Sequence, residues 1–202
     1  MSGWLSFPDP GLAMSEDVEM VRRALTLVDE PDQVGTCQQM LDLLSDRPDP
    51  LSRSERPGHF TGSALVLDEQ RERLLVLLHA KLGIWVQPGG HADGDANLAH
   101  VALREATEET GMRGLSVWNH PIDLDIHRVD PPREDAHDHH DVRFVVVASR
   151  HSVLDPNDES HDQRWVTERE LAGLGADRGL RRLARRGLSL AQTLPEANPS
   201  TA

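Results

Sequence analysis

The sequence predicts an α/β domain with a helical extension on its N-terminal side. Short runs of apolar and β-branched residues, bounded by turn residues, recur from residue 59 onward and are typical of strands. Stretches with apolar residues three and four positions apart precede and separate these runs, as in amphipathic helices. The chain has 202 residues, 38% of them hydrophobic, which is enough for the core of one domain. We expect residues 1–57 to form the extension and its connector, and residues 58–202 to form the domain.

Two helices are predicted in the extension. Residues 15–28 repeat apolar side chains at helical spacing, and Ser15 is the expected N-cap. Residues 33–44 carry a second apolar face that begins at Val34. Cys37, the single cysteine, lies on this face and is expected to be a small buried apolar residue rather than a nucleophile.

The domain is predicted to begin with a β-hairpin formed by residues 60–67 and 74–79, which a charged turn separates. A short strand over residues 84–87 ends at Pro88, and a turn-rich loop is expected over residues 91–95.

A helix is predicted over residues 97–110, closed by Gly111. Further strands are expected at residues 115–118, 124–127, 142–148 and 164–166, and helices at residues 168–174 and 180–194. The polar stretch 128–141 is long for a connection, and such connections are usually lids or binding loops. The arginines of the last helix are expected to form a solvated face.

The formal net charge of −13 disfavours binding to bulk nucleic acid or to anionic lipid. No stretch approaches the ~20 consecutive apolar residues of a membrane span, and the first residues lack the pattern of a secretory signal. We therefore expect a soluble, cytoplasmic protein whose anionic ligands, if any, bind with the help of a cation.

The candidate chemistry lies on the helix predicted over residues 97–110. Glu105, Glu108 and Glu109 stand at i, i+3 and i+4, so their carboxylates share one helix face. Like charges at these spacings repel, and no Lys or Arg lies at the positions between them. A Mg²⁺ ion would offset this repulsion, because it prefers carboxylate, water and phosphate oxygens. The alternative is a solvated acidic helix face.

The segment from Gly90 to Met112 resembles the Nudix (MutT-type) box, Gly-x5-Glu-x7-Arg-Glu-U-x-Glu-Glu-x-Gly-U, in which U is apolar. Eight of the nine defining positions match in register. The matches are Gly90, Arg104, Glu105, Ala106, Glu108, Glu109, Gly111 and Met112. The box glutamate that has no match falls on Ala96. The resemblance covers roughly residues 58–174.

The resemblance implies a Nudix fold, a mixed β-sheet sandwiched between α-helices, and hydrolysis of a diphosphate bond in a nucleotide-derived small molecule. It also implies that Glu105, Glu108 and Glu109 bind Mg²⁺ or Mn²⁺, and that the carbonyl of Gly90 adds a ligand. Glu105 and Glu108 are then catalytic residues, and Arg104 orients the glutamates and contacts the substrate. Because dimers are common in the family, a homodimer is among the expected states.

Ala96 is the departure from the box, and Asp93 or Asp95 is expected to replace the missing carboxylate. If neither acid replaces it, the alternatives are that the protein binds a different number of metal ions or that it is a slow enzyme. The resemblance also implies a further acidic ligand or base before the strand that carries Trp165. Glu159 is the candidate, with Asp158 and Asp162 as alternatives, and each alone could be a solvated loop acid.

His137, His139 and His140 form a second cluster. A strand through this segment sends residues 139 and 140 to opposite faces, so the spacing does not predict a dedicated zinc site. We expect His139 and Arg143 to line the substrate cleft; the alternative is ordinary polar residues at the start of a strand. His91 follows the glycine pair and is expected to contact phosphate or water.

The sequence thus predicts a Mg²⁺-dependent hydrolase of a small phosphoanhydride. A first alternative, favoured by Ala96, is a Nudix-fold sensor that binds a nucleotide without turnover. A second is an isomerase of the isopentenyl diphosphate type, which needs a cysteine in the core of the fold, whereas Cys37 lies in the extension.

Overall fold

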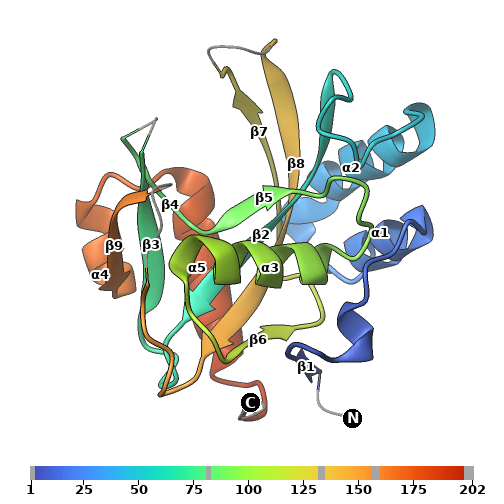
Figure 1. Ribbon diagram of the computed structural model, residues 1–202. Helices are drawn as coiled ribbons and strands as arrows, with labels where there is room; N and C mark the ends of the chain where they lie inside the picture. Colours follow the sequence, from blue (N-terminus) through green and yellow to red (C-terminus); the bar gives the residue numbers. More distant parts are fainter. Residues whose placement is uncertain (1–2, 81–82, 132–134, 156–159, 198–202) are drawn as a thin grey trace.

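The computed structural model describes residues 3–80, 83–131, 135–155 and 160–197 and shows a mixed β-sheet with helices on both faces (Figure 1). The strands are β1 (Trp4–Leu5), β2 (Gly58–Leu67), β3 (Leu74–His79), β4 (Trp85–Val86), β5 (Gly89–His91), β6 (Leu115–Trp118), β7 (Asp123–Val129), β8 (His137–Ala148) and β9 (Ser160–Val166). The helices are α1 (Val18–Leu25), α2 (Val34–Asp46), α3 (Leu98–Thr110), α4 (Glu168–Gly173) and α5 (Arg178–Ala191). Within the described residues, no helix is long and apolar enough to cross a lipid bilayer.

The sheet is organised around β2 and β8, which pair in parallel over ten residues. The strand order is β1-β6-β8-β2-β3-β4, while β5 pairs with β2, β7 with β8 and β9 with β3. All of these other pairs are antiparallel. The arrangement confirms the expected fold, a mixed sheet between helices.

Every residue of β2 is buried, because helices cover both of its faces. Phe60, Ala64 and Val66 share an apolar core with α3. Leu65 and Leu67 point to the opposite face and share a second core with α5. The two faces of β2 therefore belong to two different layers of the molecule, and this separation decides where the polar side chains of the sheet can meet.

The N-terminal extension is tied to the sheet and is not purely helical. β1 pairs with β6 through Trp4 and Trp118, and residues of α1 and α2 share the apolar core that includes α3. Two details of the prediction are wrong. The N-cap of α1 is Asp17 rather than Ser15, because the Asp17 carboxylate accepts a hydrogen bond from the first turn. Val34 is 69% exposed rather than buried.

Half of the predicted long connection, seven of the fourteen residues over 128–141, is strand. β7 and β8 form an antiparallel ladder down to the pair Val129 and His137, and the first residues of β8 pair with the start of β2. Backbone partners on both sides thus extend β8 into a polar segment. The prediction of a loop at residues 91–95 is wrong in part, because His91 belongs to β5 and pairs with Thr61 of β2.

The sequence predicted that the arginines of α5 are solvated, and this prediction is wrong for Arg182 and Arg186. Arg182 donates to Asp123 and Asp125 of β7 at 2.8 Å, and Arg186 bonds both Asp123 and Asp32. Asp123 is fully buried, so its charge needs these partners. Ion pairs of Arg182 and Arg186 with aspartates of β7 therefore hold α5 against the sheet.

Candidate functional site

Helix α3 presents the three glutamates that the sequence singles out. Asn97 caps the start of the helix, its side chain accepting from the backbone N–H of His100, and Gly111 ends it in a left-handed conformation with φ of +67°. The buried side chain of Val101 packs against Gly62 of β2. With the helix fixed at its ends and along one side, its last turns place the glutamates next to β5 (Figure 1).

The glycine pair of β5 lies directly against these glutamates. The backbone N–H of Gly89 donates to the Glu109 carboxylate at 3.0 Å. A Cβ atom on Gly90 would overlap the carboxylate of Glu105. A side chain at residue 90 would therefore displace the Glu105 carboxylate, whereas glycine lets the strand backbone and this carboxylate approach closely.

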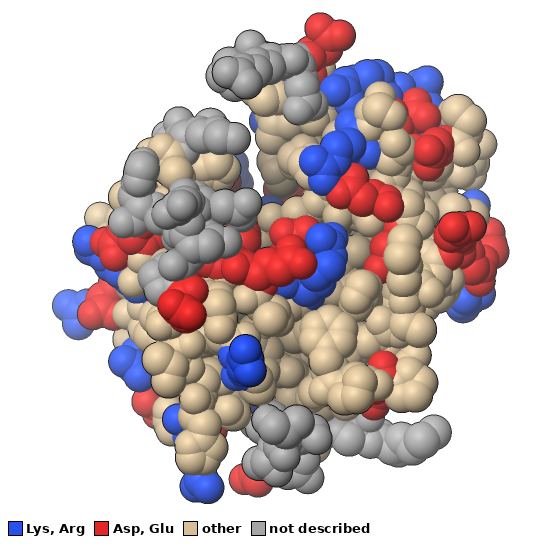
Figure 2. Space-filling view, in the orientation of Figure 1, with Lys and Arg blue, Asp and Glu red and all other residues tan. Residues whose placement is uncertain are grey.

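Arg104 bridges two of the three glutamate carboxylates, those of Glu105 and Glu108. Its guanidinium lies 2.9 Å from Glu105 and 3.6 Å from Glu108, and it donates to the backbone carbonyl of His91 at 3.1 Å. The spacing argument considered only the positions between the glutamates and left Arg104 out, whereas the resemblance implied that Arg104 orients them. Three carboxylates and one guanidinium leave a charge of −2, which suits a divalent cation. Figure 2 shows acidic side chains gathered over α3 with basic side chains beside them.

The carboxylates differ in their access to solvent. The side chain of Glu105 is 15% exposed, that of Arg104 31% and that of Glu108 58%. The site therefore has an inner end held by protein contacts and an outer end open to an incoming ion or ligand.

The position of the missing box glutamate is a buried alanine. Ala96 is 2% exposed, and its N–H donates to the carbonyl of Ser15 in the N-terminal segment. Asp95 accepts from the N–H groups of Ser15 and Asn97 and lies 2.5 Å from His100 Nδ1. The N-terminal extension thus covers Ala96, and the hydrogen bond from Ser15 to Asp95 holds the extension against the box loop.

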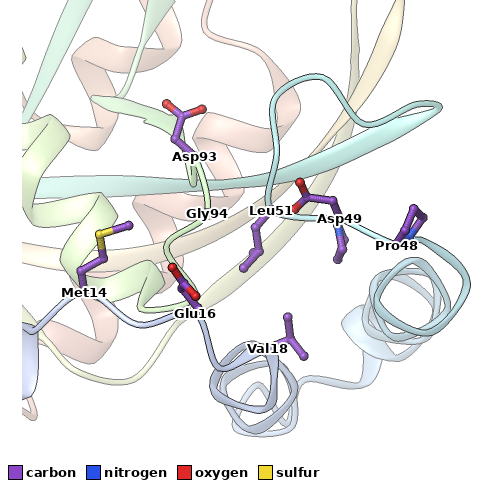
Figure 3. A pocket seen from close by; sticks show the side chains of 9 residues that line it. Met14, Glu16, Val18, Pro48, Asp49, Leu51, Asp93 and Gly94 are labelled. Atoms are coloured by element: carbon purple, nitrogen blue, oxygen red, sulfur yellow. The ribbon is translucent and has the colours of Figure 1, made fainter.

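Asp93 is the other acid proposed to replace the missing glutamate, and it pairs with Arg53. The hydrogen bond from Arg53 lowers the pKa of the Asp93 carboxyl, and the charges of His91 and Arg104 act in the same direction. Asp93 also lines a cavity of about 400 Å³ between the connector and the start of α1, together with Met14 (Figure 3). This cavity lies beside the box loop, and Glu105, Glu108 and Glu109 do not line it.

The predicted catalytic base, Glu159, lies outside the described residues, as does Asp158. Asp162 lies on β9 and pairs with Arg164, whose Nε donates to it at 2.7 Å. Gln163 of the same strand donates to the backbone carbonyl of Glu109 at 2.8 Å, so β9 contacts the C-terminal end of α3.

Arg143 does not line an open cleft. It is 3% exposed, and its three guanidinium nitrogens donate to Asp141, Asp123 and Asp125 at 2.7, 3.3 and 3.0 Å. The expectation of a substrate contact is corrected here, because the neighbouring aspartates of β7 and β8 use all three nitrogens.

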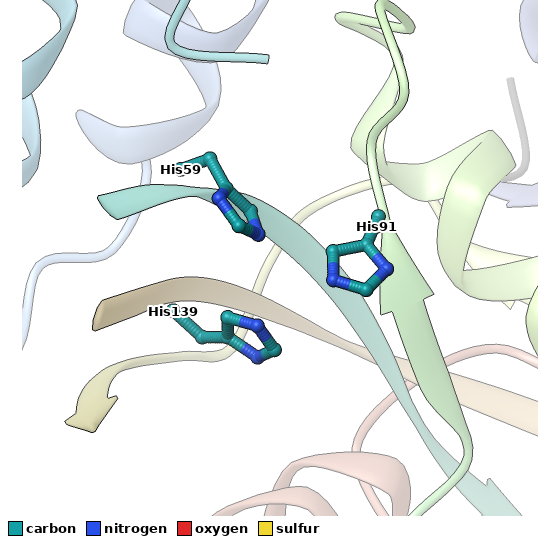
Figure 4. A group of neighbouring side chains, drawn as sticks. All are labelled: His59, His91 and His139. Carbon is teal, nitrogen blue, oxygen red and sulfur yellow. The ribbon is translucent and has the colours of Figure 1, made fainter. Parts of the chain in front are cut away.

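His91 and His139 lie close together, and His59, which the sequence reading did not single out, lies with them (Figure 4). The ring centroids of the three residues are 5.1 to 5.2 Å apart. The alternation predicted for residues 139 and 140 holds, but the parallel register places His59 directly beside His139. The phrase Gly58-His59-Phe60 is visible in the sequence, whereas the register that makes it relevant is not.

Burial favours the neutral forms of His59 and His139. It lowers the pKa of His139 to about 2 and that of His59 to about 4, and the neighbouring rings of His91 and His137 add to both shifts. Neutral imidazole is the form of histidine that binds metal ions.

The sequence of the chain matches a known protein family. Residues 59–186 match the NUDIX domain family. A Mycobacterium tuberculosis protein named "Putative 8-oxo-dGTP diphosphatase 3" is 34% identical over 128 residues, which are 61% of this chain and 52% of that protein. The Danio rerio protein "m7GpppN-mRNA hydrolase NUDT17" is 31% identical over 113 residues, 48% of this chain and 35% of that protein. The matched region thus spans about half the length of the mycobacterial relative.

Solved structures agree on the fold. A C. elegans Ap4A hydrolase binary complex aligns with a TM-score of 0.56 at 12% identity, covering 67% of this chain and 98% of that one. The Nudix hydrolase RenU from M. smegmatis aligns with a TM-score of 0.51 at 22% identity, covering 70% and 91%. The family match extends over more than half of the sequence and includes β2, β5 and α3. The chain therefore belongs to the Nudix hydrolase superfamily.

Proposed function

We propose that this protein is a pyrophosphohydrolase that needs a divalent metal ion and acts on a nucleotide-like small molecule. The observation that carries the proposal is the placement of Glu105 against Gly90 and of Glu109 against Gly89. Glu108 lies on the same helix, and Arg104 bridges it to Glu105. Membership of the Nudix superfamily supports it, since the family implies a divalent metal. The relatives named above, whose names refer to nucleotide compounds, support the substrate class.

The donor set fits Mg²⁺, with Mn²⁺ as a substitute. Glu105, Glu108, Glu109 and the carbonyl of Gly90 would hold the ion, and all of them offer the oxygen ligands that such cations prefer. When bound, the ion supplies charge neutralisation at the phosphate oxygens and lowers the pKa of a bound water.

The residues of the chain itself prepare this site. Arg104 holds Glu105 and Glu108 in fixed positions, and the N–H of Gly89 fixes Glu109. Glu108 is more exposed than Arg104 and Glu105, so it is placed to meet an incoming substrate and its water. We propose Glu159 as the general base that takes the proton of the attacking water.

The substrate class that we propose is a nucleoside polyphosphate or a nucleoside diphosphate derivative. A screen over 8-oxo-dGTP, other nucleoside triphosphates, ADP-ribose, nucleotide sugars and dinucleoside polyphosphates tests it. We expect Mg²⁺-dependent release of phosphate, pyrophosphate or nucleoside monophosphate. The rate should fall at least ~100-fold in Glu108→Gln and in Glu159→Gln. Glu69→Gln, at an exposed position in the β2–β3 turn, is the matched control and should keep the wild-type rate.

The buried Ala96 favours one competing function, a sensor that binds nucleotides without turnover. Calorimetry on the same compounds separates the two. Binding of a nucleotide in Mg²⁺ with no product from any compound would support the sensor and overturn the hydrolase.

A further inference from the structure

We infer that His59, His91 and His139 form a second metal site, which takes a transition-metal ion that prefers imidazole nitrogen, with Zn²⁺ as the best match. This inference stands apart from the proposed function, because it uses none of the glutamates. Its residues come from β2, β5 and β8, and β2 pairs with both of the other strands (Figure 4).

The geometry brings three ligand atoms together. One ring nitrogen of each histidine lies within 4.8 Å of the corresponding nitrogens of the other two. An ion at the centre of such a triangle lies about 2.8 Å or less from each nitrogen, whereas a Zn–N bond is about 2.0–2.1 Å. Each ring therefore has to move by less than about 1 Å, which small side-chain rotations provide.

The protonation of His59 suits a ligand. Its Nδ1 faces the backbone carbonyl of Glu55 at 3.4 Å. A carbonyl oxygen only accepts, so Nδ1 carries the proton and Nε2 presents its lone pair. Metal-binding histidines typically donate their second ring N–H to a backbone carbonyl or a carboxylate in this way.

Two ring nitrogens of the histidine cluster are buried and make no hydrogen bond with the described residues. Among the described residues, His59 Nε2 and His139 Nε2 have no hydrogen-bond partner, and His59 is fully buried. An unpaired buried polar atom costs ~1–3 kcal/mol, and such atoms in native proteins often mark an ion or a water. A cation bound to these two nitrogens would satisfy both of them at once.

Further histidines surround the three proposed ligands. The His137 ring lies 4.9 Å from that of His59 and 5.2 Å from that of His139, and its Nδ1 donates to the carbonyl of Asp135 at 2.7 Å. His127 packs on His139 from β7 and pairs with Asp125. These neighbours enclose the three rings and limit the orientations they can adopt.

The sheet separates this site from the glutamates. On β2, Gly62 faces α3, whereas Thr61 and Ser63 face the other way and donate to Asp141. Side chains alternate along a strand, so His59 lies on the same face as Thr61, opposite α3. The two sites also differ in chemistry, because carboxylates suit Mg²⁺ and imidazoles suit Zn²⁺ and similar ions. Three histidines leave a fourth tetrahedral position for water or a ligand oxygen.

Titration of the full chain with Zn²⁺ tests the inference. The protein is first dialysed against a chelator and then kept in excess Mg²⁺, so that the carboxylates do not compete for Zn²⁺. We expect one equivalent of Zn²⁺ to bind, and Co²⁺ to give the intense visible bands of tetrahedral coordination. His91→Gln and His139→Gln should each weaken Zn²⁺ binding at least ~10-fold, while His151→Gln, at an exposed position, should leave it unchanged.

A measurement on the unaltered protein guards against variants that fail to fold. In a ¹⁵N-labelled sample, Zn²⁺ should shift the ring nitrogens of His59, His91 and His139 and leave those of His120 in place. Absence of Zn²⁺ and Co²⁺ binding would overturn the inference. So would binding that survives in folded His91→Gln and His139→Gln, or binding that is lost in Glu108→Gln. The last result would assign Zn²⁺ to the carboxylates and leave the hydrolase proposal standing.

Discussion

The carboxylate of Glu105 occupies the space in which a side chain on residue 90 would lie, so Glu105 keeps this position while residue 90 is a glycine. This contact joins the strand that ends in the glycine pair to the helix that carries the glutamates. It explains in steric terms why a glycine stands at the first position of the box.

Gly90→Ala should displace the Glu105 carboxylate and weaken binding of the divalent cation. We expect Mn²⁺ affinity, measured by electron paramagnetic resonance, to fall ~10–100-fold, the range seen when groups that orient metal ligands are altered. Gly35→Ala is the control, because a Cβ there meets no atom within 4 Å. Unchanged Mn²⁺ affinity in folded Gly90→Ala would show that Glu105 does not bind the ion.

Restoring the box glutamate with Ala96→Glu should destabilise the protein rather than improve it. The alanine is buried beneath the N-terminal segment, so a carboxylate there loses its hydration without gaining a partner. We expect the free energy of unfolding in urea to fall by about 3 kcal/mol or more. Ala172→Glu, at an exposed position in α4, should change it by less than about 0.5 kcal/mol. A stable Ala96→Glu variant with raised activity would mean that the side chain reaches the catalytic site.

Arg143→Met should lower stability because it leaves Asp123, Asp125 and Asp141 with fewer cationic partners. Removing one member of a buried ion cluster costs ~3–5 kcal/mol, and the same urea experiment measures it. The matched change at an exposed arginine of α5, Arg178→Met, should cost less than about 0.5 kcal/mol. Equal effects of the two substitutions would contradict the structural role of Arg143.

The acid sensitivity of the protein should depend on Asp125. Burial acts to raise the pKa of its carboxyl, but the hydrogen bonds from His127 and Arg182 and the charge of Arg143 outweigh burial and hold the pKa well below its usual range. A group with a lowered folded pKa contributes stability above its unfolded pKa, about 3.9 for Asp, and loses it as the pH falls further.

The free energy of unfolding of the wild type should therefore fall more steeply below about pH 4 than that of Asp125→Asn. Urea unfolding at a series of pH values measures the two slopes. Parallel slopes would show that Asp125 has the same pKa in the folded and unfolded chains.

Local sequence pattern was sufficient for the parts of the molecule that depend on near neighbours. The hairpin of β2 and β3 was predicted from two short runs of strand-forming residues with a charged turn between them, and the end of helix α3 from Gly111; the structure confirms both. The shared face of Glu105, Glu108 and Glu109 follows from helical spacing alone. These features depend on residues a few positions apart, which the sequence displays directly.

What the sequence determined by itself is the set of acidic side chains on one face of a helix and the strands around that helix. The tertiary structure alone decided that His59 meets His139, since the two lie 80 positions apart and only the parallel register of β2 and β8 aligns them. It also decided that Arg143 is buried among aspartates. The physical reason is that packing between segments far apart in the sequence sets which strands pair and which side chains meet, and local periodicity does not specify these partners.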